Sequence, residues 1–168
     1  CLECPRGRWS NVAGAKMLGD CRACARGRYG QTKAMASRNC SGLCPVGTFS
    51  IAGLTECLNC TKGWYADTPG QAECKICAPS EDTLDNGADA CVCGRGFYFY
   101  PPTTSCAKCL DDEMDCGNTI GLSISTVRTK NGFWRSSNTS NNIKPCPVEA
   151  ACVNSTCAPG HEGPFCMV

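Results

Sequence analysis

The sequence predicts a small disulfide-rich fold, an elongated array of short β-hairpin cysteine-rich repeats with little regular secondary structure. Cysteine accounts for 19 of the 168 residues, a share typical of disulfide scaffolds. These cysteines recur at short, regular intervals, which indicates a repeat array. The hydrophobic fraction of 42% includes the cysteines. Too few other apolar residues remain for one continuous core, so covalent cross-links must replace apolar burial.

Each repeat opens with a cysteine, and most repeats continue with glycine and an aromatic residue at fixed positions. The repeats open at Cys4, Cys24, Cys44, Cys60, Cys77 and Cys93, and the last ends at Cys109. Glycine at the third position suits a turn with positive φ, and the aromatic residue begins a short strand that covers a disulfide. We therefore expect each repeat to be a small hairpin that contacts mainly its neighbours. The repeat from Cys77 to Cys93 lacks the glycine and the aromatic residue and is a variant spacer.

The simplest disulfide scheme joins each opening cysteine to the cysteine just before the next repeat. Extended along the chain, it gives Cys4–Cys21, Cys24–Cys40, Cys44–Cys57, Cys60–Cys74, Cys77–Cys91, Cys93–Cys106, Cys109–Cys116, Cys146–Cys152 and Cys157–Cys166. A staggered scheme that bridges repeat boundaries is the alternative, because a sequence does not fix connectivity. Nineteen is an odd number, and we expect Cys1 to pair with a residue upstream of this chain.

The cysteine pattern divides the chain into three segments. Residues 1–109 hold the tandem repeats, and residues 110–145 hold an acidic turn followed by a polar excursion without cysteine. Two strands are predicted there, around 122–128 and 132–135, joined by a turn at Lys130-Asn131-Gly132. Residues 146–168 close the chain with eight residues between Cys157 and Cys166, which resembles the last hairpin of an EGF-like module.

The motif Cys44-Pro45-Val46-Gly47-Thr48-Phe49-Ser50, followed by Cys57-Leu58-Asn59-Cys60, resembles the ephrin-receptor-like repeats, also called GCC2/GCC3 repeats. These repeats are related to tumour-necrosis-factor-receptor-like cysteine-rich modules. The tail from Gly132 to Cys166 is similar to a segment that follows such repeats in large surface proteins of algae, oomycetes and ciliates. The resemblance implies a stalk, an adhesion region, a receptor ectodomain or a part of an extracellular filament.

The composition predicts an extracellular or cell-surface location through the secretory pathway, since disulfides persist in oxidising compartments. Four Asn-x-Ser/Thr sequons agree with this location and predict N-linked glycans at Asn39, Asn59, Asn138 and Asn154. The net charge of +1 gives no evidence for a nucleic-acid partner. No apolar run approaches the ~20 residues of a membrane span, so no membrane contact is predicted within this segment.

The residue inventory argues against an enzyme and against a cofactor. His161 is the only histidine, and it lies in a short glycine-flanked turn, so no nucleophile with a histidine base is predicted. The spacing of Cys21 and Cys24 with Cys57 and Cys60 would allow zinc, but the compartment favours disulfides. One acidic run provides hard oxygen ligands for calcium, although a solvated turn is the alternative reading: Asp111, Asp112, Glu113 and Asp115.

One aromatic and basic cluster, Phe133-Trp134-Arg135, lies outside the repeats. It is predicted either to pack onto the EGF-like tail or to contact a partner, since aromatic residues and arginine are enriched at interfaces. We expect the whole chain to be an extracellular structural or interaction segment of a larger filament-forming or cell-surface glycoprotein, such as a stalk or a flagellar-hair-like assembly. Its partners would be other extracellular proteins or further copies of the same protein. The alternative is a ligand-binding receptor ectodomain of the tumour-necrosis-factor-receptor-like type.

Overall fold

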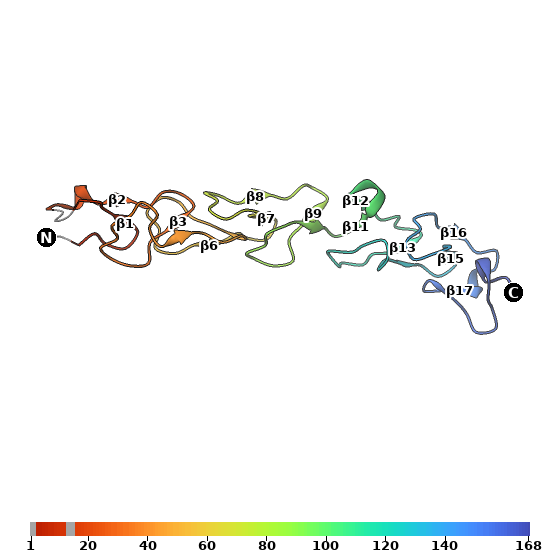
Figure 1. The fold of residues 1–168 in the computed structure, drawn as a ribbon. Helices are drawn as coiled ribbons and strands as arrows, with labels where there is room; N and C mark the ends of the chain where they lie inside the picture. Colours follow the sequence, from red (N-terminus) through yellow and green to blue (C-terminus); the bar gives the residue numbers. More distant parts are fainter. Residues whose placement is uncertain (1–2, 13–15) are drawn as a thin grey trace. The chain divides into compact units, whose positions relative to one another are not determined.

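The computed structural model describes residues 3–12 and 16–168 (Figure 1). Every strand in these residues belongs to a two-stranded antiparallel hairpin. The hairpins are β1 (Arg8–Trp9) with β2 (Arg22–Ala23), β3 (Arg28–Tyr29) with β4 (Gly42–Leu43), β5 (Thr48–Phe49) with β6 (Leu58–Asn59), β7 (Trp64–Tyr65) with β8 (Lys75–Ile76), β9 (Glu81–Asp82) with β10 (Val92–Cys93), β11 (Phe97–Tyr100) with β12 (Ser105–Lys108), β13 (Met114–Asp115) with β14 (Arg128–Thr129), β15 (Phe133–Trp134) with β16 (Lys144–Pro145), and β17 (Cys152–Val153) with β18 (Thr156–Cys157).

The remaining regular structure consists of single 3-10 turns. They are η1 (Leu18–Asp20), η2 (Pro101–Thr103), η3 (Glu149–Ala151) and η4 (Pro164–Cys166). The described residues hold no α-helix, and within them no helical segment reaches the length and apolar character of a membrane span. The prediction of a small disulfide-rich fold of short hairpins, with little regular secondary structure, is confirmed.

Nine disulfides close the hairpins in the described part of the chain. They join Cys4–Cys21, Cys24–Cys40, Cys44–Cys57, Cys60–Cys74, Cys77–Cys91, Cys93–Cys106, Cys109–Cys116, Cys146–Cys152 and Cys157–Cys166. The structure thus joins the residues that the sequential scheme joins, and the staggered scheme is not adopted. Cys1, the expected unpaired cysteine, lies outside the described residues.

The chain forms two compact units, and each is described by itself. Unit 1 comprises residues 1–77 and 83–91, and unit 2 comprises residues 78–82 and 92–168. The variant repeat that opens at Cys77 therefore contributes to both units. The three-segment division drawn from the cysteine pattern stays a prediction about the domains of the chain.

In the first three repeats of unit 1 the glycine makes the same two backbone hydrogen bonds. The carbonyl of Gly7 accepts a hydrogen bond from Cys24, which opens the next repeat, and the amide of Gly7 donates to Gly30 O at 2.8 Å. Gly27 and Gly47 repeat this pattern, donating to Ser50 O and Ala66 O. All three glycines have φ near +76°, a conformation in which a Cβ is disfavoured. The glycine spacing seen in the sequence therefore fixes both the turn and the link to the next hairpin.

Contacts in unit 1 also reach the second repeat along the chain. A Cβ placed on Gly47 would lie 1.9 Å from the carbonyl oxygen of Gly87, two repeats further on. Gly27 has the same relation to Gly70, and Gly7 has it to Gly53. Gly87 in turn donates its amide to Cys60 O at 2.7 Å. Each of the first three repeats is thus interlocked with the next two repeats through main-chain atoms, which adds second-neighbour contacts to the expected nearest-neighbour contacts.

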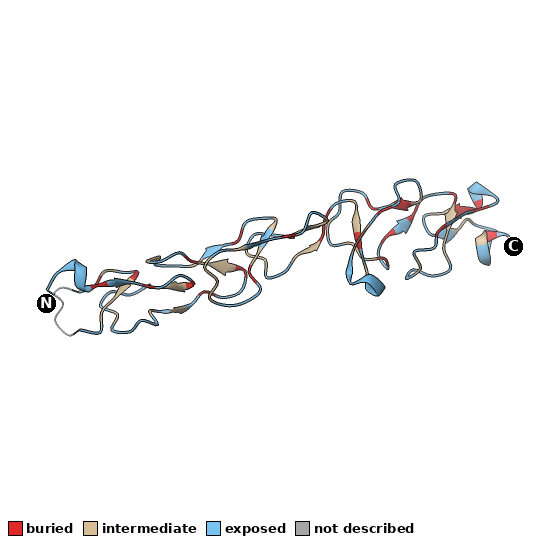
Figure 2. Cartoon of the chain, turned by 90° about the horizontal axis from the view of Figure 1, so that it is seen from above, coloured by how far each residue is buried: buried red, intermediate tan, exposed pale blue. Residues whose placement is uncertain are grey.

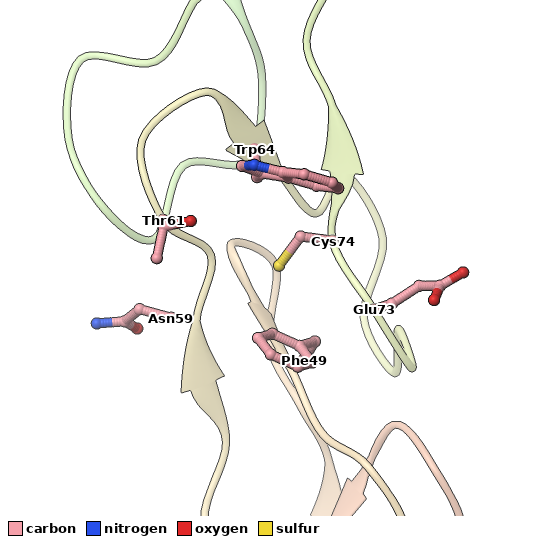
Figure 3. A pocket seen from close by; sticks show the side chains of 6 residues that line it. All are labelled: Phe49, Asn59, Thr61, Trp64, Glu73 and Cys74. Carbon is pink, nitrogen blue, oxygen red and sulfur yellow. The ribbon is translucent and has the colours of Figure 1, made fainter.

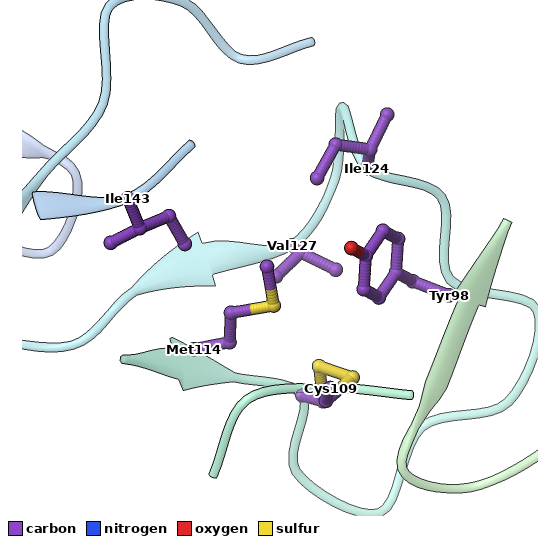
Figure 4. Packing of buried hydrophobic residues seen from close by; sticks show 7 residues of the cluster. Tyr98, Cys109, Met114, Ile124, Val127 and Ile143 are labelled. Atoms are coloured by element: carbon purple, nitrogen blue, oxygen red, sulfur yellow. A yellow bond between two sulfur atoms is a disulfide. The ribbon is translucent and has the colours of Figure 1, made fainter. Parts of the chain in front are cut away.

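Unit 2 contains side-chain cores that the sequence did not predict. One cluster, which we call the tyrosine core, comprises Tyr98, Cys109, Met114, Cys116, Ile124, Val127 and Ile143. Figure 4 shows Tyr98, Met114 and Val127 converging beside the Cys109 disulfide. A second cluster, the tail core, comprises Cys146, Ala151, Cys152 and Cys166. The supposed polar excursion therefore supplies much of the apolar interior of unit 2.

The predicted pairing of residues 122–128 with residues 132–135 is wrong. Strand β14 pairs with β13, and β15 pairs with β16. The reason is that Gly132, with φ +84°, forms the turn of a repeat rather than of a hairpin between these strands. Its carbonyl accepts from Cys146 N and its amide donates to Cys152 O, as the repeat glycines do in unit 1.

The repeat pattern therefore continues through the segment that lacks cysteine. Thr129 lies three residues before Gly132, where other repeats have their opening cysteine. Ile143 lies three residues before Cys146, where most repeats have their closing cysteine. Both residues are buried, with exposed fractions of 1% and 6%. In this hairpin a threonine and an isoleucine occupy the places of a disulfide.

Candidate interaction surfaces

A depression of unit 1 lies where the third and fourth repeats meet (Figure 3). Its volume is about 420 Å³, and it is lined by Phe49, Asn59, Thr61, Trp64, Glu73 and Cys74. Phe49 belongs to β5 and Trp64 to β7, so the pocket is walled by the aromatic residues of two successive repeats. Phe49 is the aromatic residue of the Gly-x-aromatic pattern in its repeat, whereas Trp64 lies one position before the equivalent residue, Tyr65.

The pocket combines an apolar interior with one acidic group. Figure 3 shows the Cys74 sulfur between the rings of Trp64 and Phe49. Trp64 lines the pocket together with Cys74, which belongs to the Cys60–Cys74 disulfide, and 41% of the Trp64 surface is exposed. Glu73 adds a carboxylate at the pocket. Such a site suits an apolar side chain that carries a positive charge, because an exposed tryptophan provides contact area at little entropic cost.

The loop that supplies Glu73 and Cys74 is held by an ion pair. Lys75 Nζ lies 2.8 Å from a carboxylate oxygen of Asp67, and Gln71 Nε2 donates to Asp67 at 2.7 Å. The hydrogen bond from Lys75 lowers the pKa of Asp67, and the same bond raises the pKa of Lys75. Both side chains are exposed, so the pair orders the loop more than it stabilises the fold.

The structure places Phe133, Trp134 and Arg135 within the fold of unit 2. Phe133 packs against the tyrosine core, and Trp134 packs against the tail core. The ring of Trp134 lies 4.7 Å from the ring of Phe165, centroid to centroid. Of the two alternatives for this cluster, these contacts favour packing onto the tail, while contact with a partner stays a prediction.

The Arg135 side chain links its own segment to residues 124–127 through hydrogen bonds to main-chain carbonyls. Its Nη1 donates to Ile124 O at 2.9 Å, and its Nη2 donates to Val127 O. Burial lowers the pKa of Arg135, and burial also raises the pKa of nearby Tyr98. The guanidinium therefore satisfies carbonyl groups beside the tyrosine core that water does not reach freely.

The acidic run shows no arrangement of metal ligands. Among the described residues, no group of three or more His, Cys, Asp or Glu side chains is placed to hold a metal ion. A shallow hollow of about 310 Å³ gathers Asp111, Asp112 and Glu113, but Lys108 also lines it. Lys130 Nζ donates to the main-chain carbonyl of Asp111 at 2.5 Å. The cysteines considered for zinc are all in disulfides.

All four predicted glycosylation sites, Asn39, Asn59, Asn138 and Asn154, are exposed. Asn59 is at the edge of the aromatic pocket, and Asn154 is in the turn between β17 and β18 with φ +48°. Exposure is the property that an acceptor asparagine needs, and glycosylation at these positions stays a prediction.

The only histidine stabilises the closing hairpin. Its Nδ1 lies 3.0 Å from the carbonyl oxygen of Cys166, and its amide donates to Ala158 O. These contacts give His161 a structural role next to the Cys157–Cys166 disulfide.

The aromatic pocket was not predicted, and the repeat pattern indicates only one of its two rings. The Gly-x-aromatic pattern marks Phe49 and Tyr65, whereas Trp64 lies one position earlier. The distance between Phe49 and Trp64 depends on how neighbouring hairpins stack, and the sequence does not give this distance. The exposure of Trp64 follows from the same stacking.

Comparison with known proteins agrees with the geometry of the repeats. The family model described as tyrosine-protein kinase ephrin type A/B receptor-like matches residues 47–91. The sushi, von Willebrand factor type A, EGF and pentraxin domain-containing protein 1 of Mus musculus is 29% identical over 135 residues, which are 67% of this chain and 4% of that protein. The signal peptide, CUB and EGF-like domain-containing protein 3 of Homo sapiens is 30% identical over 88 residues, which are 48% of this chain and 9% of that protein.

This chain spans less than a tenth of the length of these curated relatives. The match to the ephrin-receptor-like family model covers the third to fifth repeats, where the interlocked hairpins and their disulfides are described. Residues 47–91 are thus similar to the ephrin-receptor-like repeats, within a chain that is a disulfide-rich array of cysteine-rich repeats.

Proposed function

We propose that this chain is an extracellular structural and interaction segment of a larger cell-surface or filament-forming glycoprotein. The main support is the interlocked main chain of unit 1, in which each of the first three repeats contacts the next two and carries its own disulfide. A segment built in this way resists local unfolding without a large core, because opening one hairpin breaks contacts in its neighbours. Disulfides also limit unfolding to short loops.

The relatives support the extracellular part of the proposal. Their names include EGF, CUB and sushi domains together with a signal peptide or a von Willebrand domain. The disulfide content of this chain independently favours an oxidising compartment. We propose that its partners are other extracellular proteins or further copies of the same protein.

Electron microscopy of the native glycoprotein tests the structural proposal. A regular polymer, or a stalk in which this segment repeats at fixed spacing, is the expected result. A dispersed monomer that captures a soluble protein ligand would contradict the filament and favour a receptor. The same glycoprotein carrying Gly47→Ala is imaged for comparison. This substitution breaks one interlocking contact, so it should shorten or disorder the assembly. Gly96→Ala, whose added Cβ meets nothing within 4 Å, is its control.

The aromatic pocket favours a ligand-binding ectodomain as the second candidate function. It offers the exposed ring of Trp64 and is also lined by Glu73, a combination that suits a lysine or arginine side chain of a protein ligand. Trp64→Ala should weaken capture of such a ligand by roughly tenfold or more, measured by surface plasmon resonance. Ile76→Ala is the control, since Ile76 is 69% exposed and does not line the pocket. Equal loss in both variants would exclude the pocket as the binding site.

A further inference from the structure

The net charge of +1 conceals a strong asymmetry along the chain. The residues up to Leu43 hold eight basic side chains against two acidic ones, Glu3 and Asp20, a net charge of +6. The rest of the chain holds eight basic and thirteen acidic side chains, a net charge of −5. The basic side chains of the first part are Arg6, Arg8, Lys16, Arg22, Arg26, Arg28, Lys33 and Arg38. We call the first two repeats with these side chains the basic segment.

Two of these arginines occupy the same place in consecutive repeats. The motif Arg-Gly-Arg-aromatic occurs at residues 6–9 and again at residues 26–29. Arg8 Nη1 donates to Cys21 O at 2.9 Å, and Arg28 Nη1 donates to Asn39 O at 3.0 Å. Each guanidinium is therefore fixed against its own hairpin by one N–H group. An arginine has five such donors, so several remain for a ligand at a corresponding place on each repeat.

The two acidic groups do not neutralise the basic segment. The Asp20 carboxylate accepts hydrogen bonds from the main-chain amides of Lys16 and Met17. The only ion pair found among the described residues joins Asp67 and Lys75, outside this segment. Six of the eight basic residues are exposed, and Arg8 and Arg28 are half-buried. Such an uncompensated field attracts an extended anion.

We propose that the basic segment binds a linear sulfated polysaccharide. Arginine forks pair well with tetrahedral and planar oxyanions, and a linear polyanion can contact the corresponding arginines of consecutive hairpins at once. Nucleic acid fits less well, because single strands require open aromatic faces. Trp9 and Tyr29 are half-buried, and Arg22 lies over the Trp9 ring at 5.8 Å. An acidic protein, including the acidic part of a second copy, is the other occupant that the experiment separates.

The test measures binding of the full chain to immobilised heparin across a range of salt concentrations. Wild-type protein should bind at physiological ionic strength, with a log affinity that falls linearly with log salt, as expected for counterion release. Fully desulfated heparin should bind at least tenfold more weakly. Poly-glutamate and duplex DNA of equal charge are competitors that should displace the protein less effectively than heparin.

Two variants with equal change in net charge locate the site. The test variant is Arg6→Gln, Arg26→Gln, Lys33→Gln and Arg38→Gln, and the control variant is Lys62→Gln, Lys108→Gln, Arg128→Gln and Lys144→Gln. All eight residues are exposed. The test variant should lose about tenfold or more in affinity and show a shallower salt slope. The control should stay within about twofold of wild type.

Equal loss in both variants, or equal binding of desulfated heparin, poly-glutamate or DNA, would overturn the proposal. Failure of the wild type to bind heparin at physiological salt would do the same. If the test variant does not fold, arginine footprinting of the wild type replaces it. Heparin should then protect Arg6 and Arg26 but not Arg128. Electron microscopy of the assembly tests the proposed structural function, and heparin binding tests the basic segment. Either proposal can therefore fail without the other.

Discussion

Units 1 and 2 are stabilised in different ways, although both consist of disulfide-closed hairpins. The buried residues of unit 1, as far as it is described, are cysteines, glycines and a few small residues, and none is a large apolar side chain (Figure 2). Unit 2 buries Tyr98, Met114, Ile124, Val127 and Ile143. Unit 1 therefore depends on sulfur and main-chain contact, whereas unit 2 adds a side-chain core.

The comparison shows how a repeat can lose its disulfide. In the hairpin of β15 and β16, Thr129 and Ile143 take the places of two cysteines. Both are buried, and Ile143 belongs to the tyrosine core. A disulfide whose cysteines are 13 to 17 residues apart contributes about 3 kcal/mol. Burial of one large apolar side chain contributes about 1.5–3 kcal/mol, so Ile143 offsets much of the missing disulfide.

Reduction should have the largest effect and should separate the two units. With dithiothreitol we expect unit 1 to lose all slowly exchanging amides, since five disulfides of about 3 kcal/mol each are removed and no apolar core remains. Unit 2 should lose most of its protection but retain some around the tyrosine core. Hydrogen exchange resolved by peptide measures both. EDTA is the control and should leave the exchange pattern unchanged; unfolding in EDTA alone would indicate metal thiolates in place of disulfides.

Disulfide mapping by mass spectrometry checks the basis of this prediction. Proteolysis without reduction should release peptides that join Cys44 to Cys57 and Cys60 to Cys74. Peptides that join Cys57 to Cys60 would contradict the sequential scheme.

Gly47→Ala should be one of the most damaging single substitutions of a glycine in unit 1, together with Gly27→Ala. The new methyl group would lie 1.9 Å from Gly87 O, so the main chain two repeats away must move. The cost should exceed the ~1–2 kcal/mol of a left-handed alanine. Gly96→Ala has the same φ of +76° but no atom within 4 Å, and should cost only that strain. Thermal unfolding followed by near-ultraviolet circular dichroism compares the two, and equal losses would refute second-neighbour interlocking.

Val127→Ala tests the side-chain core of unit 2. Val127 is 2% exposed, and removal of two buried methyl groups should destabilise unit 2 by about 1–3 kcal/mol. Ile76→Ala in unit 1 is the matched control, because Ile76 is 69% exposed and its truncation should change stability by less than ~0.5 kcal/mol. A large effect at Ile76 would mean that unit 1 also has an apolar core.

Thr129→Val should have a smaller effect on the hairpin without a disulfide. The change keeps the buried shape but removes Oγ1, which donates to Phe133 O at 3.1 Å and lies 3.2 Å from Ser155 Oγ. Loss of these bonds should cost about 1 kcal/mol, measured by urea unfolding. Thr156→Val, an exposed control in strand β18, should cost less. An increase in stability would show that the hydroxyl is not satisfied in this site.

The Asp67–Lys75 ion pair should have the smallest effect, since both side chains are exposed. The pKa of Asp67 is lowered by its hydrogen bond from Lys75, so any stability that it contributes is present above the ordinary aspartate pKa and is lost as the pH falls through the lowered value. The pKa of Lys75 is raised, so its contribution is present below the ordinary lysine pKa and is lost as the pH rises. Asp67→Asn should leave the midpoint of thermal unfolding at pH 7 nearly unchanged; a shift of several degrees would contradict this.

Part of the candidate site was predictable from the sequence, and part was not. The Cys-x-x-Gly-x-aromatic unit defined the hairpins of residues 4–76, because its turn and its disulfide are local. The sequence prediction places residues 122–128 and 132–135 in one hairpin, because it locates the repeats by their cysteine spacing alone. Gly132 keeps the position of the repeat glycine where the cysteines are absent. The glycine spacing therefore predicts this repeat better than the cysteine spacing does.

The sequence by itself determined the short-range features of this protein: the repeat length, the hairpin turns and the sulfur-rich composition that replaces a core. These depend on residues within about twenty positions of each other, whose geometry the backbone restricts. The tertiary structure decided how hairpins stack, and hence the contact of Gly47 with Gly87, the pocket between Phe49 and Trp64, and the core around Val127. Those features depend on distances between residues that only packing brings together.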